Sequence, residues 1–80
     1  MTSLVSVVND IIARRDILAL MELMDDLTDS VDVLYSDENA EEVPVTLPIS
    51  GDYTQHTLLW ANANELEACR QVMKDWASRV

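Results

Sequence analysis

Residues 43–49 read Val-Pro-Val-Thr-Leu-Pro-Ile, and this segment has the pattern of a strand at the edge of a sheet. Apolar side chains alternate with prolines and a threonine, which is the period-two pattern of a strand with one buried face. Pro44 and Pro48 share the same parity, so their missing N–H donors fall on one lateral side of that strand. Because proline cannot donate to a ladder, we expect this side to be an unpaired sheet edge.

Strand signals continue on both sides of this stretch. Residues 50–52 (Ser-Gly-Asp) are a turn signal, and residues 53–60, with aromatic side chains at both ends, are predicted to pair back as a hairpin. Residues 31–35 are rich in β-branched and aromatic side chains, so we predict a further strand there. A polar, acidic loop over residues 36–42 connects this predicted strand to the strand at residues 43–49. If strand 31–35 joins the other side of the hairpin, the run 53–60 becomes the central strand of three.

Helical periodicity dominates both ends of the chain. Ser3 can cap an opening helix, and the apolar stripe changes register around Asp16, a suitable second N-cap, so we expect two short helices or one kinked helix. Near the other end, Asn64 with Glu67 three residues later resembles a capping box before an amphipathic helix. The apolar stripe of that last helix is predicted to consist of Leu66, Cys69, Met73, Trp76 and Val80.

These elements predict an α+β fold of order α-α-β-β-β-α, in which helices cover one face of a small three-stranded antiparallel sheet. The 80 residues fit a single acidic domain, 1–80, since a chain this short builds only one core. Methionine and tryptophan at these spacings are ordinary core residues. We therefore assign to the core Met21, Met24, Met73, Trp60 and Trp76.

The charge distribution is the strongest functional signal in the chain. Fifteen acidic residues against five basic ones give a formal net charge of −10. All the acids except Asp10 and Asp75 lie between residues 16 and 69, where there is no Lys or Arg. Such a surplus opposes direct binding to nucleic acid or to an anionic membrane. With no apolar run of membrane-spanning length and a lone cysteine, Cys69, which suits a reducing compartment, we expect a cytoplasmic protein.

The sequence does not predict an enzyme, a cofactor site or a metal site. Cys69 falls on an apolar helical stripe, where a buried thiol behaves as a small hydrophobe, and His56 is the one imidazole. The acids form two clusters, over residues 25–32 and 37–42, and neither has the glycine that a helix–loop–helix calcium site requires. Residues 29–31 (Asp-Ser-Val) are similar to the Asp-Ser-Leu attachment site of acyl carrier proteins, but a strand-like pattern follows where that family has a long helix. Carrier function is therefore not predicted.

The acidic residues themselves form the predicted binding surface. If residues 17–28 are helical, the acids of that segment cluster into a carboxylate ridge that can dock into a groove lined with Lys and Arg. The opposite, apolar side of the helix is predicted to consist of Ile17, Leu20, Met24 and Leu27. Acids further along the chain extend the ridge. The predicted partner-binding residues are Glu22, Asp25, Asp26, Asp29, Asp32, Asp37, Glu38, Glu41 and Glu42.

This surface favours a small inhibitor, of the immunity-protein or anti-defence type, that mimics nucleic acid and occupies the basic groove of a nuclease or host-defence complex. The expected partner is a basic, nucleic-acid-processing protein. Two alternatives stay open. One is a dimeric structural or chaperone-like adaptor without inhibitory activity, and the other is an acidic surface that only confers solubility. Mimicry predicts binding that falls steeply with salt, whereas an adaptor that uses apolar contacts does not.

Overall fold

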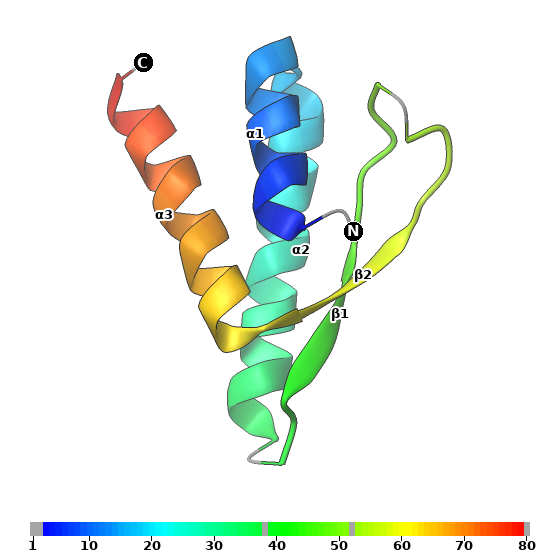
Figure 1. Ribbon diagram of the computed structural model, residues 1–80, viewed down its shortest axis with the longest axis vertical. Helices are drawn as coiled ribbons and strands as arrows, with labels where there is room; N and C mark the ends of the chain where they lie inside the picture. Colours follow the sequence, from blue (N-terminus) through cyan, green and yellow to red (C-terminus); the bar gives the residue numbers. More distant parts are fainter. Residues whose placement is uncertain (1–2, 38, 52, 80) are drawn as a thin grey trace.

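The computed structural model describes residues 3–37, 39–51 and 53–79, and it has the α+β class that the sequence predicts. The elements follow one another as α1 (Leu4–Arg14), α2 (Ile17–Ser36), β1 (Glu42–Thr46), β2 (Leu58–Asn62) and α3 (Ala63–Arg79). The three helices stand side by side, and the β1–β2 hairpin flanks α2 (Figure 1). Three residues of the predicted turn, ridge and stripe lie outside the described part of the chain: Glu38, Asp52 and Val80.

Local capping separates the first two helices. The backbone N–H of Ser6 donates to Ser3 Oγ over 3.2 Å at the start of α1. Arg15 ends that helix in the left-handed conformation (φ 57°). Asp16 then begins α2, because its Oδ1 accepts from the backbone N–H of Ala19 over 3.2 Å. Two helices therefore form, each with its own N-cap.

The predicted strand at residues 31–35 is wrong, because α2 continues through this segment to Ser36. Val31 and Leu34 lie four and seven residues after Leu27, so they extend the face that α2 packs against the core. Burial of that helical face overrides the strand propensity of the β-branched residues. The sheet consequently has two strands instead of three, and residues 53–60 do not form a central strand.

The hairpin is shorter than the sequence predicts. β1 and β2 pair antiparallel with Pro44 opposite Trp60, and Leu47 N–H donates to Thr57 O over 2.7 Å in the same register. Beyond Leu47 and Thr57 the chain forms a loop, which is closed by an isolated β-bridge between Ser50 and Tyr53. Within the described residues β2 is the one strand paired with β1, so the other edge of β1 carries no strand, as Pro44 requires.

The core lies between the inner faces of the helices and the inner face of the hairpin. Of the α2 side chains predicted for the core, Leu20 and Leu27 are buried, whereas Ile17 and Met24 are 45% and 46% exposed. Leu23, which was not predicted, is fully buried. α2 is longer than the predicted helix and packs along a face that includes Leu34. In the first turns of the helix this face differs from the predicted stripe. Met73 is buried as predicted, and Trp76 is partly buried. Two further residues predicted for the core are exposed instead: Met21 and Trp60.

The last helix begins earlier than its capping-box pattern suggests. Asn62 is the cap, and its Oδ1 accepts from the backbone N–H of Glu65 over 2.9 Å. α3 therefore starts at Ala63 instead of after Asn64. Its buried side chains include Leu66 and Cys69, as predicted.

Candidate functional site

The carboxylates that α2 carries lie on its outer side. Glu22, Asp25, Asp29 and Asp32 are exposed, and Asp26 is half-buried. Their spacings of three, one, three and three residues keep them together on a helix, opposite the buried face. The structure thus places five of the predicted binding residues on one surface, which we call the α2 ridge: Glu22, Asp25, Asp26, Asp29 and Asp32.

The remaining predicted binding residues surround the turn that leaves α2. Asp37 directly follows the helix, and its Oδ1 accepts from the backbone N–H of Asn39 over 3.0 Å. Glu41 precedes β1 and Glu42 is its first residue, and both are exposed. These acids lie beyond Asp32 at the end of the helix, so they add negative charge there without joining the row on the helix itself. Glu38 lies outside the described residues.

Burial and the neighbouring ridge carboxylates both disfavour the charged form of Asp26. Partial burial is the main cause that raises the pKa of Asp26, and the negative charges of Glu22, Asp29 and Asp25 raise it further. His56, on the loop between the strands, acts in the opposite direction. The ridge therefore holds negative charge that a bound cation would stabilise.

A shallow hollow of about 240 Å³ lies between the ridge and β1. Asp26 and Asp29 stand on its α2 side, while Val33 and Pro44 supply apolar surface. Arginine and lysine bury a hydrocarbon stem and keep a charged head near carboxylates, so the hollow has the chemistry to receive such a side chain. The sequence did not predict it, because it exists only where β1 packs beside α2.

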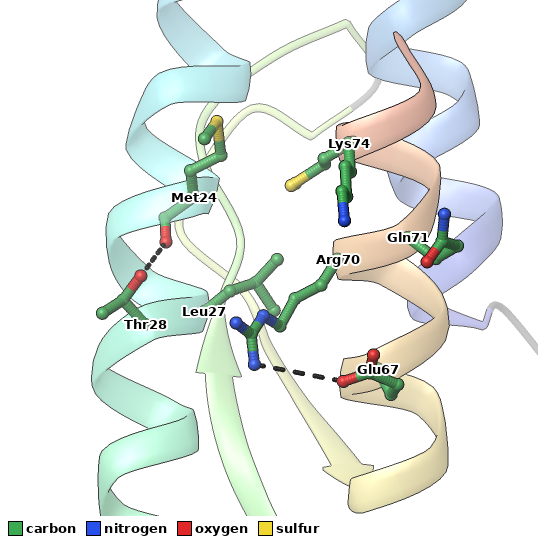
Figure 2. Close-up of a pocket in the computed structure, with 8 residues that line it drawn as sticks. Met24, Leu27, Thr28, Glu67, Arg70, Gln71 and Lys74 are labelled. Atoms are coloured by element: carbon green, nitrogen blue, oxygen red, sulfur yellow. Dashed lines mark hydrogen bonds and ion pairs between the residues drawn. The ribbon is translucent and has the colours of Figure 1, made fainter. Parts of the chain in front are cut away.

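A second hollow, of about 380 Å³, opens between α2 and α3. Met24, Leu27 and Thr28 border it from α2, while Arg70 and Lys74 reach into it from α3 (Figure 2). The sequence did not predict this groove, because Met24 was assigned to the core.

Two residues that the sequence singled out for possible chemistry, Cys69 and Ser30, are buried. Cys69 is fully buried, and burial together with nearby Glu65 raises the pKa of its thiol to about 11. Ser30, the serine that resembles an attachment site, is buried in the middle of α2 and donates its hydroxyl to Pro44 O. Within the part of the chain that the structure describes, no three His, Cys, Asp or Glu side chains are grouped to hold a metal ion.

No protein-family model matches this chain, and neither a curated protein nor a solved structure is significantly similar to it. Function is therefore inferred from the chain's own surfaces. Among the described helices, none has the length and apolar character needed to cross a membrane.

Proposed function

We propose that this chain is a small inhibitor, of the immunity-protein or anti-defence type, that presents the α2 ridge to a basic protein in place of nucleic acid. The observation that carries the proposal is the spacing of five carboxylates between Glu22 and Asp32 on the outer side of α2. At about 1.5 Å per residue they span about 15 Å, or one carboxylate per 3 to 4 Å. Phosphates along one strand of B-DNA recur every ~3.4 Å, so the two charge rows have comparable density.

The ridge is held on a fixed scaffold, which favours binding because little order is lost on association. Leu20, Leu23 and Leu27 anchor the opposite face of α2 in the core. None of the ridge carboxylates forms an ion pair with a Lys or Arg in the described part of the chain. The ion pair found there joins Arg70 to Glu67 on α3, over 4.0 Å. The ridge charge is thus available to cations of another protein.

The hollow beside the ridge supports a partner rich in arginine or lysine. One such side chain can place its stem against Val33 and Pro44 and its charged head beside Asp26 and Asp29. This chemistry matches the Lys/Arg-lined groove of a nucleic-acid-processing enzyme. A cytoplasmic location, where a lone thiol stays reduced, is part of the proposal.

An adaptor without inhibitory activity is the second candidate, and the exposed apolar residues of α2 favour it. Leu18 is 80% exposed and Met21 is 58% exposed, in a helix otherwise built on a well-buried face. Contiguous exposed apolar surface commonly marks an interaction site. This function predicts binding that depends on apolar side chains and changes little with salt.

An affinity capture with the immobilised chain at low salt separates these functions. Captured proteins are eluted with a salt gradient and identified by mass spectrometry. The ridge variant combines Glu22→Gln, Asp25→Asn, Asp26→Asn and Asp29→Asn. The matched control removes four negative charges elsewhere, through Asp10→Asn, Glu65→Gln, Glu67→Gln and Asp75→Asn.

The inhibitor proposal predicts capture of a strongly basic nucleic-acid-processing protein by the wild type and by the control, with elution at raised salt. The ridge variant should lose this capture. Equal capture by the ridge variant and the control would contradict the proposal, as would a partner that elutes independently of salt.

A further inference from the structure

A line of exposed side chains runs along α2 next to the ridge but separate from it. Ile17, Met21, Met24, Thr28 and Tyr35 follow one another at intervals of four, three, four and seven residues, which places them on one side of a helix. All five are exposed, and Tyr35 is 75% exposed. We call this line the α2 strip. A largely apolar strip this long on an 80-residue chain leaves surface that a partner would cover.

The α2 strip borders the groove between α2 and α3. Met24 and Thr28 belong to both, and Met73 lies on the opposite wall. Arg70 and Lys74 extend from α3 into the space between the helices (Figure 2). The contact of Arg70 with exposed Glu67 is long, at 4.0 Å, and contributes little. An occupant of this groove therefore needs apolar side chains flanked by carboxylates.

The helix α2 itself carries apolar side chains flanked by carboxylates. Leu27 lies on the side of the strip that faces α3, whereas Asp25 and Asp32 lie on the other side, directly next to the exposed apolar line. We propose that a second copy of this chain covers the groove, with the two α2 strips in contact and the Asp25–Asp32 flank of each copy against Arg70 and Lys74 of the other.

The heights of these residues along the helices fit a two-fold arrangement. Arg70 borders both the groove beside Thr28 and a smaller hollow beside Val31, whereas Lys74 borders only the first. A two-fold axis parallel to α2 sets the two copies of α2 parallel and lays each α3 over the acidic flank of the other copy. Lys74 of one copy then faces Asp25 of the other, and Arg70 faces Asp32. Each pair occurs twice.

The net charge of −10 per chain opposes self-association, but its range is short. At physiological ionic strength the Debye length is about 8 Å, so the charges at the contact outweigh those elsewhere. Glu22, Asp26 and Asp29 lie further round α2 and stay outside this contact, so each copy keeps three of its five ridge carboxylates for another protein. The dimer does not depend on the proposed inhibitor function, and a thin single-domain core gains stability from the added burial.

A charge-swap experiment tests the dimer. Sedimentation velocity of the wild type at about 100 μM, enough to populate a dimer with a micromolar dissociation constant, should give twice the 9.0 kDa mass of the chain. The variants Arg70→Glu/Lys74→Glu and Asp25→Lys/Asp32→Lys should each be monomeric, because like charges then face each other across both contacts. An equimolar mixture of the two should form a heterodimer, in which every contact again joins opposite charges.

Two control variants change charge outside the groove and should stay dimeric: Asp10→Lys/Asp75→Lys and Arg79→Glu. Circular dichroism checks that each variant is folded. Where a reversal lowers the helical signal, the amide forms Asp25→Asn/Asp32→Asn and Arg70→Gln/Lys74→Gln replace it and should weaken dimerisation at least about tenfold. A monomeric wild type, a dimeric reversal variant or a mixture that stays monomeric would each overturn the proposal.

Discussion

Ser30, in the middle of α2, donates its hydroxyl to the carbonyl oxygen of Pro44 on β1 over 3.0 Å. Ser30 is only 7% exposed, and Pro44 has no N–H, so this bond uses the one backbone hydrogen-bonding group that Pro44 has. The contact fixes the ridge helix against the proline edge of the hairpin. A helix thus occupies the place where the sequence suggested a third strand.

Removal of this hydroxyl should destabilise the fold. Ser30→Ala is expected to lower the free energy of unfolding by about 1 to 2 kcal/mol, because a partly buried carbonyl loses its partner. Urea unfolding followed by circular dichroism measures the change. Ser36→Ala is the control, since its hydroxyl bonds to Asp32 O on the exposed end of α2, and it should stay within about 0.5 kcal/mol of wild type. Equal effects of the two substitutions would contradict this role of Ser30.

Asp16 should make the fold sensitive to acid. The hydroxyl of Ser50 donates to its Oδ2 over 2.8 Å, and this bond, the Ala19 N–H and the nearby Arg14 all lower the pKa of the Asp16 carboxyl. A carboxyl with a lowered folded-state pKa stabilises the fold above its ordinary pKa, about 4, and loses this contribution as the pH falls through its folded-state pKa.

Asp16→Ala should therefore lower the Tm clearly at pH 7, and the gap to wild type should shrink at about pH 3. Thermal melts at both pH values measure the gap. A gap that is as large at pH 3 as at pH 7 would show that the charge of Asp16 does not matter.

Asp26 should behave in the opposite way, because its pKa is raised by burial and by the surrounding acids. The contribution of Asp26 to the stability of the fold is present below the ordinary aspartate pKa. It is lost as the pH rises through the folded-state pKa of Asp26. Asp26→Asn is thus expected to raise the Tm slightly at pH 7 while it weakens partner binding. The exposed Asp10→Asn, on α1, should leave the Tm unchanged. A drop in the Tm for Asp26→Asn would contradict destabilisation of the charged carboxylate by burial and by the neighbouring acids.

Cys69 should be an unreactive thiol in the folded protein. Its pKa of about 11, against about 8.5 for a free thiol, reduces the reactive thiolate at pH 8 by roughly a hundredfold, and burial blocks access further. Modification by a chromogenic disulfide reagent should therefore be at least about a hundred times slower in the native protein than in urea. Rapid modification of the native chain would show that Cys69 is accessible.

Local signals predicted several parts of the fold correctly. Ser3 and Asp16 were identified as N-caps from residue type and position, and the alternation around Val43 and Val45 identified a strand with one buried face. These features depend on a few neighbouring residues. The prediction of a strand at residues 31–35 was wrong because the packing of Leu34 in α2 depends on distant elements, which strand propensity does not describe.

The grouping of the ridge acids was predictable for the same local reason, whereas the two hollows were not. Acids three and four residues apart share one side of any helix that contains them, so the grouping did not require the correct core stripe. The groove depends on how far α3 stands from α2 beside Met24 and Arg70. The sequence wrongly predicted that Met24 points into the core. For this reason the α2 strip was not predicted either.

The most direct test of the ridge as a nucleic-acid mimic is competition for the captured basic protein. Fluorescence anisotropy of a labelled DNA duplex bound to that protein is followed while the wild-type chain is added, at several salt concentrations. The account predicts that the chain displaces the duplex, that displacement weakens steeply with salt, and that the four-amide ridge variant fails to displace it. Simultaneous binding of chain and duplex, or equal displacement by the ridge variant, would contradict it.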